Sequence, residues 1–205
     1  MSPTIIHLVR HGLVHSPIGV VYGRLPRFRL SGEGEAQAQA AGKSLSEKPL
    51  AAVYCSPLLR TRQTAKAVLA YHPGLKLRLA PLIIEISAPH DGVPIARMEQ
   101  REWDLYSGNT HPFEQPEHIV ARAREFLNQM RVKHAGTQIA GVTHGDVLAF
   151  TIMWAKGEYP DWHRKAEMKR FGFSDNYPQT ASITTFTFCT ENPDELPEVN
   201  YLRPY

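Results

Sequence analysis

The sequence predicts an α/β sandwich whose central sheet is mostly parallel. Short apolar, β-branched runs alternate along the chain with helical segments, and this order typically gives parallel strands covered by helices. The chain has 205 residues, of which 42% are apolar and 21% charged, enough for a buried core on both sides of a sheet. We expect one domain over residues 1–205, without repeats or a linker.

The first part of the chain predicts a strand, a long loop and a helix. Residues 4–9 are short, apolar and β-branched, as in a buried strand. Residues 13–30 contain prolines and glycines without a sustained hydrophobic period, so we expect a loop, and a loop of this length is usually functional or disordered. Ser31 is a suitable N-cap for a helix that runs to about Ser46, because acidic residues follow in its first turn.

The middle of the chain continues the alternation. Residues 50–55 predict a second strand, and residues 58–71 predict a helix that ends before a Pro-Gly pair. Residues 75–79 alternate apolar with basic side chains, as a half-exposed strand does. Proline and glycine punctuate residues 81–94, and we expect a helix around 95–105.

The last part predicts two helices and three strands. Pro116 opens a clearly amphipathic helix, since proline is favoured in the first helical turn. Residues 138–142 predict a strand, followed by a helix from about 145 to 156. After a polar stretch, a β-rich run at 181–188 and a short strand near 199–202 complete the sheet.

Three predicted strands end in residues suited to an anion. Ligands of parallel sheets bind beyond the carboxyl ends of the strands. Arg10-His11 follows the first strand, Ser56 to Arg60 follow the second, and Thr143-His144-Gly145 follows the strand near 140. We therefore expect the chemistry at this edge of the sheet.

The Arg10-His11-Gly12 turn has the residue types that phosphate chemistry needs. Arginine offers a planar fork of donors to phosphate, and glycine lets the backbone approach a ligand closely. A neutral imidazole, with an unperturbed pKa of about 6.5, is a competent nucleophile near neutral pH. The tripeptide alone is a weak indication, because a single histidine is more often structural.

The other two strand ends repeat the pattern. Arg60 falls in the first turn of a helix, where a cation opposes the helix dipole unless both face an anion. The alternative is a solvated helix face, as we expect for Arg62. His144 projects from a strand end, and the Gly145 amide follows it at a helix start, where anions bind. The alternative is that His144 is a hydrogen-bonded core residue.

These three elements resemble the signatures of the histidine phosphatase superfamily, in its phosphoglycerate mutase-like branch. The signatures are Arg-His-Gly, Ser-x-Leu-x-Arg-x-x-x-Thr-Ala and a late His-Gly, and residues 5–155 match them in the expected order. The resemblance implies a three-layer α/β/α sandwich, in agreement with the hydrophobic periodicity.

The resemblance also implies a mechanism. His11 attacks phosphorus and becomes a phosphohistidine, while Arg10, Arg60 and His144 neutralise the phosphoryl oxygens. A carboxylic acid protonates the leaving oxygen and then activates water, and no metal or other cofactor is needed. The predicted substrate-binding residues are Arg10, Gly12, Ser16, Gly23, Arg60, His144 and Gly145.

Glu85 is the predicted proton donor. The family has a glutamate after an apolar stretch, and Leu82-Ile83-Ile84-Glu85 matches. We expect burial among isoleucines to raise the pKa of this carboxyl, as a general acid near neutrality requires. Asp91 and Asp146 are the rival donors, and a surface position for Glu85 is the structural alternative.

The loops depart from the family pattern. Leu13 stands where the family has an acid, and Ser16 is the nearest polar residue for the role of an asparagine that contacts phosphate. Gly23 is a candidate amide donor, and His90-Asp91-Gly92 stands where an aromatic-x-Gly is common. These differences bear on substrate preference more than on the catalytic step.

Other enzymatic interpretations fit less well. A phosphoglycerate mutase of this type carries a longer segment between the acid and the second histidine. A cysteine-dependent phosphatase needs five residues between Cys and Arg, and Cys55 and Arg60 have four between them. A zinc hydrolase built on His11, His144 and Asp146 would place a divalent cation beside two arginines.

A non-catalytic phospholigand-binding module is the alternative from another class, since fold alone does not confer activity. The net charge of +3 is mild and no basic block is interleaved with aromatic residues, so we expect a small phosphorylated substrate and no nucleic acid. No apolar run approaches the ~18 residues of a membrane span, and we expect a cytoplasmic protein that binds no membrane, with its oligomeric state open. The two cysteines, Cys55 and Cys189, predict reduced core thiols.

Overall fold

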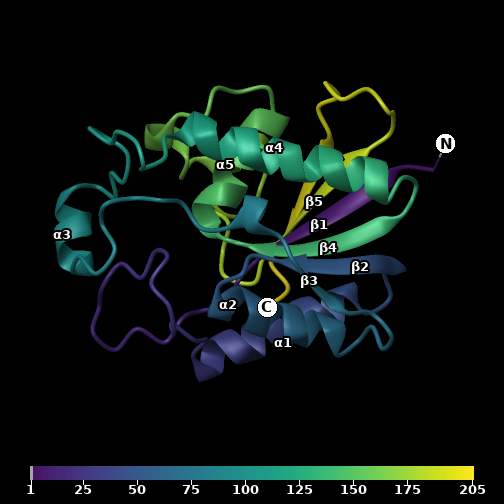
Figure 1. Cartoon of the computed structure of the whole chain (residues 1–205), viewed down its shortest axis with the longest axis horizontal. Coiled ribbons are helices and arrows are strands. Elements are labelled where there is room, and N and C mark those ends of the chain that lie inside the picture. The colour runs from purple at the N-terminus through teal and green to yellow at the C-terminus, as the bar shows by residue number, and fades with distance from the viewer. Residues whose placement is uncertain (1) are drawn as a thin grey trace.

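The computed structural model describes residues 2–205 as six strands in one sheet with helices on both faces (Figure 1). The strand order is β3-β2-β4-β1-β5-β6. The strands are β1 (Thr4–Arg10), β2 (Leu50–Cys55), β3 (Leu77–Leu79), β4 (Gln138–Thr143), β5 (Ile183–Phe188) and β6 (Glu198–Leu202). Strands β1 to β4 pair in parallel, whereas β5 runs antiparallel to both β1 and β6, so the predicted α/β fold with a mostly parallel sheet is confirmed.

The helices form the outer two layers. Helices α1 (Gly32–Leu45) and α2 (Leu59–Leu69) cover one face, and α4 (Pro116–Lys133) and α5 (Gly145–Ala155) cover the other (Figure 1). Ser31 caps α1 as predicted, because its Oγ accepts a hydrogen bond from the Gly34 amide at 3.0 Å. Among residues 2–205, no helix combines the length and apolar character needed to cross a membrane.

One predicted helix is shorter than expected. The helix predicted around 95–105 is α3 (Ile95–Gln100), and it stops because Glu102 and Trp103 take positive φ angles of 51° and 58°. These left-handed conformations cannot continue a right-handed helix.

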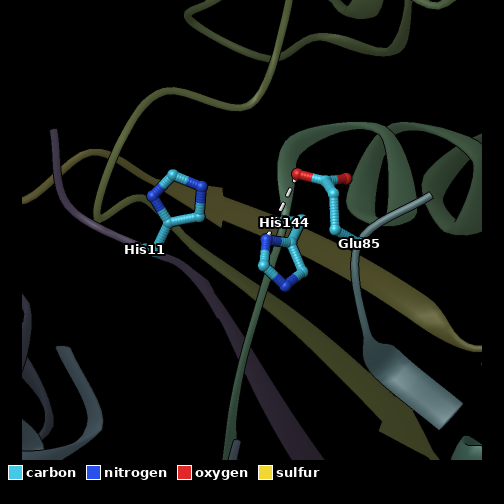
Figure 2. A group of neighbouring side chains, drawn as sticks. All are labelled: His11, Glu85 and His144. Atoms are coloured by element: carbon cyan, nitrogen blue, oxygen red, sulfur yellow. Dashed lines mark ion pairs between the residues drawn. The ribbon is translucent and has the colours of Figure 1, made fainter. Parts of the chain in front are cut away.

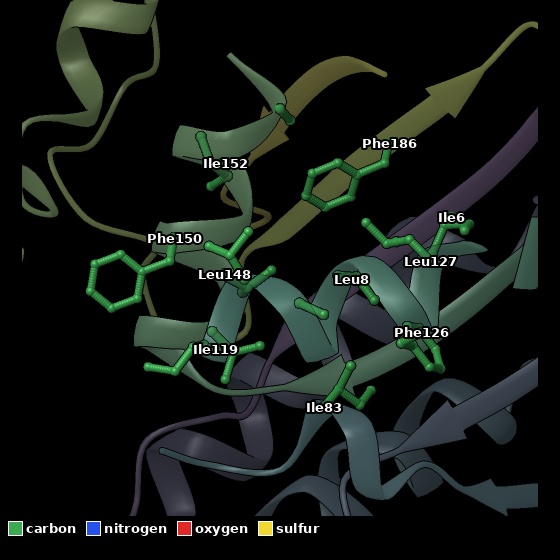
Figure 3. Packing of buried hydrophobic residues seen from close by; sticks show 14 of the residues in the cluster. Ile6, Leu8, Ile83, Ile119, Phe126, Leu127, Leu148, Phe150, Ile152 and Phe186 are labelled. Atoms are coloured by element: carbon green, nitrogen blue, oxygen red, sulfur yellow. The ribbon is translucent and has the colours of Figure 1, made fainter. Parts of the chain in front are cut away.

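The hydrophobic core is divided between the two faces of the sheet. Alternate residues of β1 illustrate the division, since Leu8 packs on the α4 and α5 side and Val9 on the other. Cys55 is fully buried in the second cluster as predicted, but Cys189 is exposed, so its assignment as a core thiol is wrong. Figure 3 shows the larger cluster, in which the labelled residues are Ile6, Leu8, Ile83, Ile119, Phe126, Leu127, Leu148, Phe150, Ile152 and Phe186.

The turn after β1 lies directly against the first turn of α1. A Cβ added to Gly12 would lie 2.3 Å from the Gly34 carbonyl oxygen, and one added to Gly34 would lie 2.0 Å from the Leu13 carbonyl oxygen. Both atoms are backbone, so neither can move away cheaply. Glycine at both positions therefore allows α1 to support the turn that carries His11.

We predict that Gly34→Ala destabilises the protein by about 1–3 kcal/mol because of this backbone contact. In an open helix the same change would stabilise by up to about 1 kcal/mol. Gly32 is the matched control, since a Cβ there meets nothing within 4 Å. Urea unfolding of both variants checks the prediction, and equal free energies of unfolding for Gly34→Ala and Gly32→Ala would contradict it.

Candidate active site

The carboxyl ends of three parallel strands bring the predicted residues together. His11 follows β1, Arg60 lies in the first turn of α2 after β2, and His144 follows β4 as the N-cap of α5. Glu85 joins them from the segment after the 3₁₀ helix η1 (Pro81–Ile83). Ligand atoms of His11, Glu85 and His144 all lie within 4.8 Å of one another (Figure 2).

His11 is buried and held in one tautomer. Its Nδ1 lies 2.8 Å from the Gly12 carbonyl oxygen, and because a carbonyl only accepts, Nδ1 carries the proton. This leaves the lone pair of Nε2 for chemistry. Burial lowers the pKa of His11 well below its usual value, and the charges of Arg60, His144 and Arg10 lower it further. The imidazole is therefore neutral, the form a nucleophile requires.

Arg60 is a buried cation, and one donor of its guanidinium has no hydrogen-bond partner among residues 2–205. Its side chain is 1% exposed, and Nη2 donates to the Gly23 carbonyl oxygen at 2.8 Å and to Glu85 Oε2 at 3.2 Å. Its Nε is buried without a hydrogen-bond partner among residues 2–205. Helix α2 has no acidic residue in its first turn and no side-chain cap, so its N-terminus adds to the attraction for an anion.

Arg10 stands at the end of β1 beside His11. Its Nη1 donates to the Pro178 carbonyl oxygen at 2.6 Å, and its guanidinium carbon lies 5.2 Å from the centre of the Tyr177 ring. Its buried Nε has no partner within residues 2–205. Arg10 thus offers a second, oriented donor group to an anion.

His144 is fully buried between Glu85 and Ser56. Its Nδ1 lies 3.3 Å from Glu85 Oε2, and its Nε2 lies 2.8 Å from Ser56 Oγ. Burial lowers the pKa of His144 to about 4, although Glu85 partly opposes the shift. The two arginines, rather than His144, therefore carry the positive charge of the site near pH 7.

The expected rise in the pKa of Glu85 is wrong. Burial does raise it, but the charge and hydrogen bond of His144, with the charge of Arg60, outweigh burial and hold the pKa well below its usual value. The sequence suggested isoleucine neighbours, whereas the carboxyl faces these polar partners, and its Oε1 accepts from the Ile86 amide at 3.0 Å.

The two rival carboxyls are engaged elsewhere. Asp146 accepts hydrogen bonds from Lys165 at 2.8 Å and from the hydroxyl groups of Tyr106 and Tyr177. Asp91 Oδ2 accepts from the backbone amide of Arg24 at 3.0 Å. Of the three candidates, Glu85 alone belongs to the group with His11 and His144.

The remaining predicted substrate-binding residues make the following contacts within the protein. Gly23 offers its carbonyl oxygen to Arg60, and the Gly12 amide donates to Thr64 Oγ1 at 3.1 Å. Gly145 lies against Tyr177, whose hydroxyl would be 2.3 Å from an added Cβ. Ser16 Oγ is buried and has no hydrogen-bond partner among residues 2–205, so no hydrogen bond joins it to the histidines.

Two contributors, Tyr22 and Ser56, were not among the predicted catalytic and substrate-binding residues. Tyr22 covers the site, with its ring centre 4.8 Å from the Arg60 guanidinium carbon and 6.3 Å from the centre of the His11 ring. Its loop shows no hydrophobic period, so no local signal predicted this contact. Ser56, the partner of His144, begins the second signature and could have been found from that position.

The geometry also bears on the zinc hypothesis. Asp146, the third ligand proposed from sequence, is paired with Lys165. His11, His144 and Glu85 could meet around an ion instead, but Arg60 Nη2 lies 3.2 Å from both Glu85 Oε2 and His144 Nδ1. A fixed cation at this position repels a divalent metal and suits a phosphate.

Comparison with known proteins agrees with this geometry. A model described as the histidine phosphatase superfamily (branch 1) matches residues 6–189. The chain belongs to the histidine phosphatase superfamily. A relative from Mycobacterium tuberculosis, named uncharacterized protein Rv0525, is 36% identical over 208 residues, which cover 98% of this chain and 96% of the relative.

Solved structures share the fold of this histidine phosphatase superfamily member. A mycobacterial glucosyl-3-phosphoglycerate phosphatase, Rv2419c, superposes with a TM-score of 0.76 at 19% identity and 97% coverage of both chains. The phosphoserine phosphatase of Entamoeba histolytica, solved with 3-phosphoglyceric acid, gives 0.72 at 20% identity, covering 97% of this chain and 96% of that one. At these identities the likeness establishes the fold.

We predict that the buried histidines make stability fall with acidity. Because the pKa of His144 is lowered on folding, the unfolded chain takes up a proton below about pH 6.5 that the folded protein does not take up until about pH 4. The free energy of unfolding should therefore drop by about 1 kcal/mol more between pH 6 and pH 5 in the wild type than in His144→Asn. Urea unfolding in phosphate-free buffer measures this, and identical pH slopes would refute it.

Proposed function

We propose that this protein is a metal-independent phosphomonoesterase that forms a phosphohistidine on His11. The observation that carries the proposal is the 2.8 Å contact between His11 Nδ1 and the Gly12 carbonyl oxygen: a carbonyl only accepts, so the proton of the neutral ring belongs on Nδ1 and Nε2 is free as the nucleophile. The guanidinium groups of Arg10 and Arg60 stand beside it, and both have an unpartnered Nε.

The first step transfers the phosphoryl group to the enzyme. His11 Nε2 attacks phosphorus, forming a P–N bond while the bond to the leaving oxygen breaks. Arg10 and Arg60 bind the phosphoryl oxygens, and His144 adds a hydrogen bond. Protonated Glu85 gives its proton to the leaving oxygen, so that an alcohol departs.

Binding of the substrate supplies the protonated state of Glu85. A phosphate group brings about −1.5 to −2 charges next to the carboxylate and takes over the hydrogen bonds of Arg60. Both changes raise the pKa of Glu85, because a like charge approaches and a positive partner is lost. In the second step Glu85, now ionised, removes a proton from water as the water attacks the phosphohistidine and phosphate leaves.

Hydrolysis is favoured over a mutase reaction by two observations. The segment between Glu85 and His144 is short, and two solved proteins with the same fold are named as phosphatases of small phosphorylated metabolites. Their names support a small phosphomonoester as substrate. A cysteine nucleophile is disfavoured, because burial raises the pKa of Cys55 to about 11.

We predict phosphate release from at least one ester in a panel of small phosphomonoesters. His11→Ala should lower kcat by at least about a thousandfold, since the nucleophile is lost. The activity should persist in EDTA, because the arginines supply the positive charge. Phosphate release is measured by colorimetry, and unchanged kcat in His11→Ala, or loss of activity in EDTA, would contradict the proposal.

The same panel separates the alternatives. A mutase would convert 3-phosphoglycerate to 2-phosphoglycerate with little free phosphate. A non-catalytic phospholigand-binding module would bind phosphorylated ligands without releasing phosphate. In that case the wild type and His11→Ala would both lack activity, and Arg60→Ala would weaken binding.

A further inference from the structure

Glu85 lies on a segment without regular secondary structure. Residues 84–87 follow η1 and belong to no helix or strand. The neighbouring catalytic residues have rigid supports in strand ends and helix starts, but this segment has no ladder of backbone hydrogen bonds to fix it. Its backbone groups are bound instead by side chains from other parts of the chain.

Arg122 of α4 binds the backbone of the residues that precede Glu85. Its Nη1 donates to the carbonyl oxygens of Leu82 at 2.8 Å and Ile84 at 2.7 Å. Its Nε donates to Glu114 Oε1 at 2.7 Å, and the side chain is only 14% exposed. Helix α4 passes close to this segment in Figure 1. One guanidinium thus joins α4, Glu114 and the chain on the N-terminal side of Glu85.

Glu114 binds Ser87, on the C-terminal side of Glu85. Its Oε2 accepts from the Ser87 amide at 2.7 Å, and its own amide donates to the Ser87 carbonyl oxygen at 2.8 Å. Arg24 completes the arrangement, because its Nη2 donates to Glu114 Oε2 at 3.0 Å and its Nε to the Glu85 carbonyl oxygen at 2.8 Å. Backbone groups on both sides of Glu85, and its own carbonyl, are therefore held.

We infer that Arg122 and Glu114 are positioning residues that hold the Glu85 carboxyl at the distance needed for proton transfer to the leaving oxygen. The inference rests on the proposed function. A proton donor must lie within hydrogen-bond reach of its acceptor, and a displacement of about 1 Å can cost about a hundredfold in rate. The planar guanidinium of Arg122 binds two carbonyl oxygens and a carboxylate at once in a fixed geometry, which the single nitrogen of a lysine does not reproduce.

Arg24 connects this support to the phosphate site. The preceding residue, Gly23, gives its carbonyl oxygen to Arg60, and Tyr22 packs over the Arg60 guanidinium. The position of the acid and the position of the cation that binds phosphate are therefore set by one network centred on Glu114. Among residues 2–205 Arg122 makes no hydrogen bond to Arg60, His11 or His144, so it is the better position to change.

The test compares two substrates with different needs for an acid. An alkyl phosphate requires a proton on its leaving oxygen, whereas p-nitrophenyl phosphate releases a stable phenolate without one. The parameter is kcat/KM, which is insensitive to the later hydrolysis of the phosphohistidine. Arg122→Lys keeps the charge and loses the fork of donors, and Glu114→Gln is a second variant of nearly the same shape.

We expect both variants to lose about ten- to a hundredfold in kcat/KM for the alkyl phosphate and less than about threefold for p-nitrophenyl phosphate. Glu85→Gln should give the same pattern with a larger loss. Arg124→Lys, on the same helix, is the matched control, because its side chain is 40% exposed and contacts Asp194 and the Trp154 ring, neither of which lies in the site. Circular dichroism and thermal unfolding confirm that each variant is folded.

An equal loss on both substrates would show that Arg122 and Glu114 are only structural and would overturn the inference. No loss on either substrate would do the same. If Arg122→Lys does not fold, Glu114→Gln decides the question. If Glu85→Gln itself shows no difference between the substrates, Glu85 is not the acid and the inference falls, while loss of activity in His11→Ala would still support the proposed function.

Discussion

The short contact between His11 Nδ1 and the Gly12 carbonyl governs the chemistry of the site, because it decides which ring nitrogen is free. Its geometry depends on the turn after β1, which Thr64 holds through the Gly12 amide and which α1 supports through the close approach of Gly34. Neither Gly12 in the turn nor Gly34 in α1 has room for a side chain. Packing between the first helix and the first strand end therefore fixes the tautomer of the proposed nucleophile.

Electrostatics explain how one site can bind a dianion and also donate a proton. Arg60 shares its hydrogen bonds between the Gly23 carbonyl and the Glu85 carboxylate, while burial keeps both histidines neutral near pH 7. A phosphate group competes for Arg60 and leaves Glu85 beside new negative charge, which favours its protonated form. In the proposed mechanism substrate binding is therefore linked to proton uptake by Glu85, which acts as the acid while protonated and as the base once it has given its proton away.

The sequence predicted the fold and most of the site because both follow from local patterns. Alternating strands and helices imply a parallel sheet, and parallel strands place Arg10, Arg60 and His144 at one edge. The low pKa of Glu85 was not predictable, since its cause is two side chains distant in sequence that override burial. The contact of Tyr22 with Arg60 was not predictable either, because the loop of Tyr22 has no hydrophobic period and long-range contacts set its path.

The measurement that tests the central claim most directly is the position of the phosphoryl group on the trapped enzyme. Rapid quenching during turnover of a ³²P-labelled substrate, followed by peptide mapping and ³¹P NMR, identifies both the residue and the ring nitrogen. The account predicts an acid-labile, base-stable label on Nε2 of His11, because Nδ1 is occupied by the Gly12 carbonyl. A label on Nδ1, on His144 or on a residue other than histidine would contradict it.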